Sequence, residues 1–509
     1  MNISNHTDFF ALQDLGLSPE SSPVITLLLG GVLFYILHYF WNNSGHSEKL
    51  PPGPKGLPFV GYWPFLGRNN NVTFWKLSKT YGPIIRVKAF SVNLIVLNDF
   101  ESIKEGLSKK ELLNRPQAIS EYSGLHGVST LNGEAWVHNR RYCLRVLRDL
   151  GFGRNSMEHH IKDEIHYFIE KISATSGAPV LLPEYAVPSV SNIITALVFG
   201  SRYHYDDPRR ILLDDSLRAF VKFFSTSAMI SFLPPPLDKL ARLPFTTIGS
   251  LSKALAKIRD FVSNEARLHQ ETLEEDTNRD FIDGYLKKMK EYENDASSHF
   301  TMNHLLGNVI NIFSAGSNTT QLSLLWHMLN CASRIEDIQV KIQEEIDVVI
   351  GKERAPVWED RNRMPFTVAN IWEMFRWRTI APMGVLRWVS EDTYVGGYLF
   401  PAGSMVLPNL YAVHMNPTEW ENPEQFIPGR FLNNNGTELV DKPEHVIQFT
   451  IGKRMCPGEM LATMQIFLYL TSILQKFTVL PEEGKTVDMT AHTYTASVPS
   501  PQKLRFLPR

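Results

Sequence analysis

A twelve-residue loop, FTIGKRMCPGEM at 449–460, restricts the possible folds of this chain more than any other feature. The loop contains Cys456, one of only three cysteines among 509 residues. The other two, Cys143 and Cys331, lie far away in the sequence. So few cysteines, in an odd number, argue against a disulfide framework and for a reducing compartment. We therefore expect any special role of Cys456 to be that of a thiolate.

The residues around this cysteine follow the spacing F-x-x-G-x-R-x-C-x-G, which is met by Phe449, Gly452, Arg454, Cys456 and Gly458. At about 5% usage per position, chance produces this pattern in such a chain on the order of once in ten thousand. Each residue type suits a thiolate that binds haem iron. The glycines permit a tight turn and a close approach to a flat macrocycle, Arg454 can pair with a haem propionate, and Phe449 can shield the sulfur. The helix expected to begin near Pro457 directs its positive end toward the sulfur and favours the thiolate. The alternative is a small buried thiol in a turn.

On these residues the chain resembles the cytochrome P-450 haem-thiolate monooxygenases, specifically the membrane-anchored microsomal type of animals, over essentially its whole length. The resemblance implies haem b (iron protoporphyrin IX) with Cys456 as the axial iron ligand. It also implies a mainly α fold with small β-sheets, built as one large helical catalytic domain. The expected reaction inserts one oxygen atom of O2 into a lipophilic small molecule such as a xenobiotic, steroid or fatty acid. NADPH then belongs to a partner, NADPH-cytochrome P-450 reductase, with cytochrome b5 as a further candidate partner, and we find no persuasive dinucleotide fingerprint in this chain.

The segment AGSNTT at 315–320 resembles the oxygen-activating helix of that family. There, Ala315 and Gly316 leave room for dioxygen, and Thr319 donates a hydrogen bond toward the dioxygen. Thr319 also distorts the helix, which a hydroxyl can do by hydrogen-bonding back onto the helix backbone. Asn318 stands where the family usually has Asp or Glu. Because an amide cannot ionise, proton delivery would then depend on water and Thr319. The alternative is a plain buried helix whose small residues serve packing.

Two further groups of residues match the family in order along the chain. Glu373 and Arg376 form an E-x-x-R pair that the resemblance places in a buried structural network with Arg430, although the family often has Glu where Gly429 stands. The residues expected to reach the haem propionates are Trp136, Arg140 and Arg387. The alternative interpretation of each charged residue in these two groups is a solvated side chain at the protein surface.

Arg141, Arg145 and Arg148 recur at helical spacing and form one cationic face. The family reading is a docking surface for the acidic reductase, and the alternative is a solvated helix face. The net charge of the whole chain is only −2, so we do not expect a nucleic-acid partner.

Substrate-contacting segments are less visible. Residues 117–130 resemble the loop over the haem, and 229–245 resemble an entry segment that dips into the membrane. Asn308, Asn311 and Ile312 share a helix face with Ala315. We hypothesise that at least one of the two amides points into the pocket and binds a polar group of the substrate. The alternative is that both are paired within the core.

The N-terminus carries an apolar run at 24–41 without Asp, Glu, Lys or Arg. Its length approaches the roughly 20 residues that cross a bilayer. With Lys49 and Lys55 following the run, the positive-inside rule places residues 1–23 in the lumen of the endoplasmic reticulum and the catalytic domain, 59–509, in the cytosol. Residues 42–58 form a linker that ends in the stiff PPGPKGLP. This single-pass topology exposes sequons at Asn2 and Asn5 to glycosylation.

The rest of the pattern is mostly helical. Residues 336–351 carry isoleucines at helical intervals and end on a capping glycine, whereas 393–409 alternate β-branched and aromatic residues with glycine and proline, which is typical of hairpins. Two rival functions stay open: a haem-thiolate isomerase or dehydratase that acts on a peroxide without a reductase, and a non-enzymatic membrane haem sensor.

Overall fold

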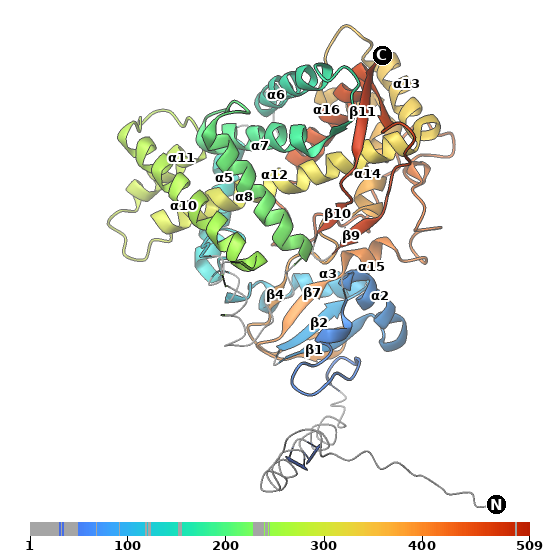
Figure 1. The fold of residues 1–509 in the computed structure, drawn as a ribbon. Coiled ribbons are helices and arrows are strands. Elements are labelled where there is room, and N and C mark those ends of the chain that lie inside the picture. Colours follow the sequence, from blue (N-terminus) through green and yellow to red (C-terminus); the bar gives the residue numbers. More distant parts are fainter. Residues whose placement is uncertain are drawn as a thin grey trace, which may run out of the picture.

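The computed structural model describes residues 30–31, 33–34, 49–67, 69–90, 92–117, 120, 124–150, 155–226, 239, 243, 245–493 and 496–509 (Figure 1). The α-helices are α2 (Asn70–Tyr81), α3 (Phe100–Ser108), α5 (Gly133–Asp149), α6 (Asn155–Ser173), α7 (Pro183–Phe199), α8 (Pro208–Thr226), α10 (Thr247–Glu271), α11 (Phe281–Glu291), α12 (Met302–Ser333), α13 (Val340–Val349), α14 (Pro365–Trp377), α15 (Leu410–His414) and α16 (Glu459–Lys476). The predicted mainly helical fold is confirmed.

The strands are short: β1 (Ile84–Ala89), β2 (Val92–Leu97), β3 (Val180–Leu181), β4 (Arg387–Trp388), β5 (Thr393–Val395), β6 (Tyr398–Phe400), β7 (Met405–Pro408), β8 (Phe477–Pro481), β9 (Ala491–Thr493), β10 (Ser497–Pro499) and β11 (Lys503–Pro508). The largest sheet has the order β1-β2-β7-β4. Its strands β2 and β7 run parallel, with Leu94 opposite Met405. The hairpins predicted at 393–409 are confirmed for β5 and β6, but β7 leaves this local pair and joins the larger sheet.

The long helix α12 crosses the helical part of the molecule (Figure 1). Its 32 residues are buried on nearly every side, which explains their apolar composition. Thr301 caps its start by accepting a hydrogen bond from the backbone N–H of His304 at 3.2 Å. The helix predicted at 336–351 is confirmed as a π-helical turn, Ile335–Gln339, that continues into α13, with Gly351 at φ +75° after the end.

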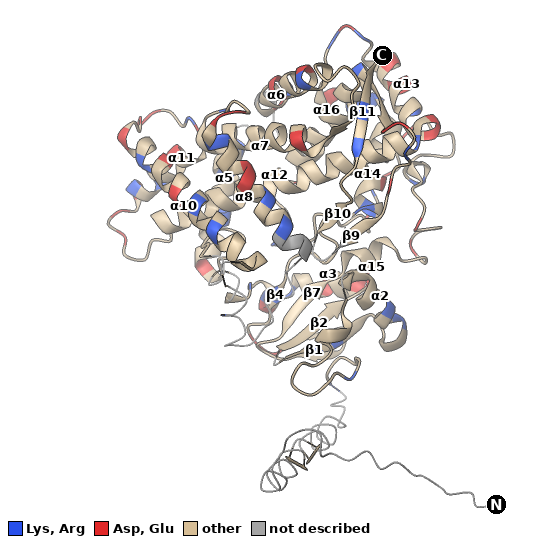
Figure 2. Ribbon diagram, in the orientation of Figure 1, with Lys and Arg blue, Asp and Glu red and all other residues tan. Residues whose placement is uncertain are grey.

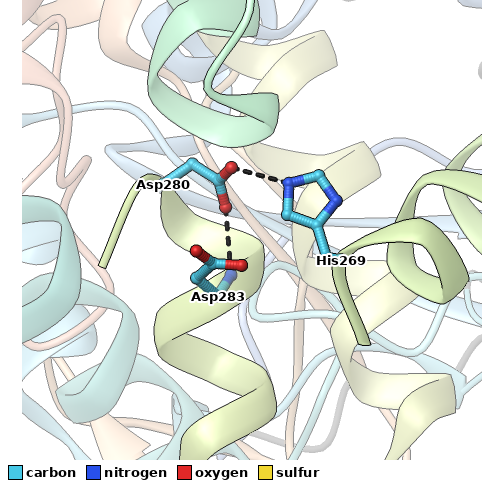
Figure 3. Close-up of side chains that lie close together, drawn as sticks. All are labelled: His269, Asp280 and Asp283. Carbon is cyan, nitrogen blue, oxygen red and sulfur yellow. Dashed lines mark hydrogen bonds and ion pairs between the residues drawn. The ribbon is translucent and has the colours of Figure 1, made fainter. Parts of the chain in front are cut away.

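Helices α10 and α11 are joined by a buried polar link. Figure 3 shows His269, near the end of α10, facing Asp280, which caps the start of α11. His269 Nε2 lies 2.7 Å from Asp280 Oδ2, and Asp280 also accepts from the backbone N–H of Asp283 at 3.0 Å. Asp283 in turn pairs with Arg279 at 2.6 Å. These charges compensate one another, so the cluster serves as an interhelical clamp.

This clamp predicts a pH-dependent contribution to stability. Burial lowers the pKa of His269, but the hydrogen bond to Asp280 and the nearby carboxylates outweigh burial and raise the net pKa. The stabilisation is therefore complete below the pKa of the unfolded chain and is lost as pH rises through the folded value. We expect His269→Gln to lower the unfolding midpoint by about 1–3 °C at pH 6 and by less at pH 9. The matched control is the same change at His166, which is 72% exposed beside Glu170 and should leave the unfolding midpoint at pH 6 unchanged because an exposed ion pair contributes little.

Within the described residues, no helix is long and apolar enough to cross a membrane. Most of the predicted anchor at 24–41, both sequons and most of 229–245 lie outside the described part of the chain. Basic and acidic residues are interspersed along the ribbon (Figure 2).

Candidate active site

The cysteine loop is held by its own backbone. Cys456 N–H donates to the carbonyl of Phe449 at 2.9 Å, and Met455 N–H donates to Gly452 at 3.0 Å. Gly452 has φ +79°, and a Cβ there would lie 2.7 Å from the carbonyl oxygen of Leu107. No other residue type fits this turn without displacing the neighbouring backbone. The glycine requirement predicted from the sequence is therefore met at Gly452.

Cys456 lies directly before helix α16, as the sequence predicts. Gly458 is the N-cap residue, and its N–H donates to Cys456 Sγ at 3.4 Å. Burial nevertheless raises the pKa of the Cys456 thiol, and the opposing effects of the Gly458 N–H and the Arg140 charge are smaller. The helix end alone does not secure the thiolate. A bound metal cation would do so, because it deprotonates a coordinating thiol.

Four buried or partly buried arginines gather beside the loop: Arg115, Arg140, Arg387 and Arg454. Burial and the mutual repulsion of these charges lower the pKa of Arg454 to about 9 and that of Arg387 to about 10. In the described part of the chain, no carboxylate lies within ion-pair distance of any of the four. Such a concentration of like charge is unfavourable unless an anion shares the site.

Orphaned donors identify where that anion belongs. Trp136 Nε1 and Arg387 Nε and Nη1 are buried without a hydrogen-bond partner among the described residues. Arg454 stacks on Trp136, with its Cζ 3.9 Å from the ring centroid. Since buried donors normally find acceptors, this arrangement fits the two carboxylates of a haem.

Arg454 and Arg140, the other two predicted arginines, also form hydrogen bonds that support the cysteine loop. Arg454 donates to the backbone carbonyls of Leu113 at 2.9 Å and Leu131 at 2.6 Å, so it also ties the cysteine loop to the segment before α5. Arg140 Nη2 donates to the carbonyl of Met455 at 2.6 Å, next to the cysteine. Both residues therefore support the loop directly, in addition to the charge they supply.

Arg115 belongs to the same cluster but has no recognisable sequence motif. Its Nη1 donates to the carbonyls of Val385 at 2.9 Å and Leu386 at 2.6 Å, immediately before Arg387. The bridge between Asn114 and Trp388 creates this proximity. Because the two arginines are about 270 residues apart in the chain, local spacing holds no signal for the pair.

On α12, Ala315 and Thr319 are exposed although most of the helix is buried. Thr319 Oγ1 donates to the carbonyl of Ala315 at 2.8 Å, the back-bonding that the sequence predicts. Gly316 instead faces α7, where a Cβ would lie 2.9 Å from Ile194 Cδ1, so its small size is required for helix packing. Asn318 is half-buried. Space for dioxygen beside Ala315 stays a prediction.

Of the two amides proposed to bind substrate, Asn308 is paired within the core, as the alternative predicts. Its Oδ1 accepts from Val128 N–H at 2.7 Å, and its Nδ2 donates to Asn139 at 2.8 Å, so both ends of the amide are used. Asn311 Oδ1 accepts from the N–H of Ser129 at 3.0 Å and from its hydroxyl at 2.6 Å. Its Nδ2 has no hydrogen-bond partner among the described residues, so the hypothesis survives for Asn311 alone.

Glu373 and Arg376 form a fully buried ion pair on α14. The two oxygens of Glu373 each accept from Arg376 at 2.7 Å, and Arg430 Nε lies 3.2 Å from Glu373. Arg376 also donates to the carbonyls of His414 and Pro423 at 2.9 and 2.8 Å. The predicted three-residue network is therefore present, and it ties α14 to the segment before the cysteine loop.

A protein-family model described as Cytochrome P450 matches residues 51–506. The chain belongs to the cytochrome P450 family. It is 34% identical over 501 residues to Cytochrome P450 2H1 of Gallus gallus, covering 95% of this chain and 99% of that protein. It is 34% identical to Cytochrome P450 2F3 of Capra hircus, covering 94% and 98% of the two chains, and 32% identical to Cytochrome P450 2A13 of Homo sapiens, covering 96% and 99%.

This P450 is therefore a haem monooxygenase, and its residues fit the cofactor. Cys456 would bind the iron, Trp136 and Arg387 would donate to the propionates through their unpaired N–H groups, and the other three arginines would add positive charge beside them. A Cβ at Gly458 would meet only Cys456 Sγ, at 3.8 Å, which leaves space for a macrocycle beside the loop. A separate cleft of about 810 Å³ reaches Cys456 between α14 and α16, but its lining includes neither Trp136, the four arginines, Ala315 nor Thr319, so it lies on another side of the cysteine from the haem-binding donors. When bound, thiolate-ligated haem supplies the activation of molecular oxygen.

Proposed function

We propose that this P450 inserts one oxygen atom of O2 into a lipophilic small molecule, with electrons from NADPH delivered by NADPH-cytochrome P450 reductase. The observation that carries the proposal is that Cys456 lies beside the buried arginine cluster. The cysteine provides an iron ligand, and Trp136 and Arg387 provide unpaired donors for haem. Ala315 and Thr319 supply an accessible face on α12. Because Asn318 cannot ionise, Thr319 would hold a water molecule there that delivers protons.

We further propose the microsomal arrangement for this chain. Residues 1–23 would be lumenal, 24–41 would anchor the protein in the endoplasmic reticulum membrane, 42–58 would link the anchor to the body, and 59–509 would form the cytosolic catalytic domain. The apolar run and the lysines that follow it support this topology. A membrane location would also place the enzyme where lipophilic substrates accumulate.

The basic face of α5 is the proposed reductase-docking surface. Arg141, Arg145 and Arg148 are exposed, and the described residues form no ion pair with them. An acidic reductase would be attracted to this face, with cytochrome b5 as a second candidate for the same surface. Such attraction between exposed charges weakens with salt.

Reductase-driven turnover is therefore expected to fall as salt rises, while peroxide-driven turnover stays constant. Arg141→Gln with Arg145→Gln should raise the KM for reductase about tenfold at low salt and leave peroxide-driven turnover unchanged. Lys253→Gln with Lys257→Gln, which removes two exposed charges from α10, is the matched control. The measurement is NADPH consumption and product formation with purified reductase and a panel of lipophilic compounds.

Equal salt responses of the two reactions would reject the docking surface. If no lipophile yields an NADPH-dependent product while a peroxide is rearranged without reductase, the proposed reductase and substrate class are both wrong.

A further inference from the structure

We propose that this P450 has a second ligand site, separate from the haem site, that binds an organic anion at Arg378. The site is a pocket of about 430 Å³ between the start of α2, the end of α14, α15 and β9. Figure 1 shows α15 beside α2, with β9 and β10 next to them. Its lining includes Asn71, Trp377, Arg378, Tyr411 and Met489, and none of the cysteine loop or arginine cluster.

Arg378 is the charged group of this pocket. Its Nη1 donates to the carbonyl of Trp377 at 3.2 Å and its Nη2 donates to that of Met489 at 2.9 Å. Its Nε is buried and has no partner among the described residues, and none of their carboxylates pairs with it. Burial lowers the pKa of Arg378 to about 10, so the side chain stays charged at neutral pH.

The nearby Arg376 is a buried arginine whose charge is neutralised by a carboxylate, and it serves as a comparison for Arg378. Arg376 has Glu373 as its counter-charge, whereas Arg378, two residues later, contacts only neutral carbonyls and aromatic rings among the described residues. Arg378 is half-buried and its Nε is fully buried, and a partly desolvated cation without an anion is unfavourable because neutral acceptors replace only part of its lost hydration. A bound carboxylate or sulfonate would supply the missing charge and accept from Nε.

The rest of the lining determines what carries the anionic group. Arg378 stacks 3.4 Å above the ring of Trp377 and lies 5.2 Å from that of Trp326, so its position is rigid. Trp377, Tyr411 and Met489 give the pocket aromatic and apolar walls, and its lining has no Asp or Glu among the residues that the structure describes. The side-chain amide of Asn71, a lining residue, makes no hydrogen bond with the described residues, so its Nδ2 is a further donor for the anionic group. The pocket therefore suits a small organic acid with a flat apolar body.

The pocket wall is connected to the segment that leads to Arg387. Tyr411 N–H donates to Pro382 at 3.0 Å, and Ser497 N–H donates to Ile380 at 2.8 Å. Binding should therefore stabilise residues 379–386 against unfolding without occupying the haem pocket. The expected sign is a rise in the unfolding midpoint.

The test uses the haem-loaded full-length protein, whose substrate site beside the haem is blocked by a tightly bound azole. 4-Butylbenzoate is titrated against it by calorimetry, and 4-butylbenzamide is the neutral isostere. We expect saturable 1:1 binding of the benzoate with a Kd of about 0.1 mM, at least tenfold weaker binding of the benzamide, and at least tenfold weaker benzoate binding to Arg378→Gln. Arg363→Gln, which removes an arginine charge from a 65% exposed side chain, should bind as the unmodified protein does.

Equal benzoate binding to Arg378→Gln, equal binding of the benzamide, or loss of benzoate binding on adding the azole would each overturn the proposal. If Arg378→Gln does not accumulate as haem protein, Asn71→Leu is the second test, because it removes the polar amide from the pocket wall at nearly the same size and leaves the arginine in place. That variant should lose benzoate binding, and unchanged binding would reject the site.

Discussion

Replacing Cys456 with serine is expected to remove the thiolate signature from the ferrous carbon monoxide spectrum and to lower monooxygenase turnover by about 1,000-fold or more. The hydroxyl is nearly the same size, and the backbone hydrogen bonds to Phe449 and from Met455 do not depend on the side chain. The change therefore tests the sulfur itself. An alcohol is a far weaker acid than a thiol, so it cannot supply an equivalent anionic ligand.

The control is Cys331→Ala, which removes a fully buried thiol on α12. Burial raises the pKa of this thiol to about 12, and the side chain lies within the hydrophobic core. Its replacement should cost stability but leave the spectrum unchanged. A Cys456→Ser protein with the original spectrum would show that the iron ligand lies elsewhere.

The second large effect is expected for Glu373→Gln. This change leaves Arg376 buried at 0% exposure without its counter-charge, and Arg430 loses the same partner. Removing one member of a buried ion pair costs about 3–5 kcal/mol, which is a large part of the roughly 5–15 kcal/mol that stabilises a typical folded protein. We expect the yield of haem-loaded protein to fall to a few per cent of the unmodified yield, as measured by haem absorbance per total protein.

Glu359→Gln is the matched control, because that side chain is 72% exposed and its nearest arginine nitrogen is 4.0 Å away. Its yield and its urea midpoint should not change. Glu373→Asp retains the charge on a shorter arm and should fall between the two. A Glu373→Gln protein that loads haem normally would mean that the network does not support the cysteine loop.

Much of the candidate site was predictable because its residues lie close together in the sequence. The turn at Gly452, the cysteine before α16 and the back-bonding of Thr319 all follow from the spacing of a few residues, and backbone geometry makes such spacing informative. The Glu373–Arg376 pair is likewise one turn of a helix. Its burial followed only from the family resemblance, since an isolated pair of this kind is usually a surface feature.

Other predictions failed or stayed incomplete where distant segments meet. Asn308 has the helical position of a pocket residue, but Val128 and Asn139 occupy its amide. No local motif marks Arg115, because the residues that it contacts lie just before Arg387 in β4, about 270 residues later in the chain. The strand β7 was expected in a local hairpin, yet it pairs in parallel with β2, about 310 residues earlier.

The sequence by itself determined the chemistry of this protein: a thiol placed at a helix start, a hydroxyl and an amide on an apolar helix, and arginines in family order. Only the tertiary structure decided which charges are neutralised. Among the described residues, the arginines beside Cys456 and Arg378 in its own pocket have no carboxylate partner, whereas Arg376 pairs with Glu373. The physical reason is that acidity, size and hydrogen-bonding capacity belong to single residues and short spacings. Burial and electrostatic compensation instead depend on contacts between segments hundreds of residues apart.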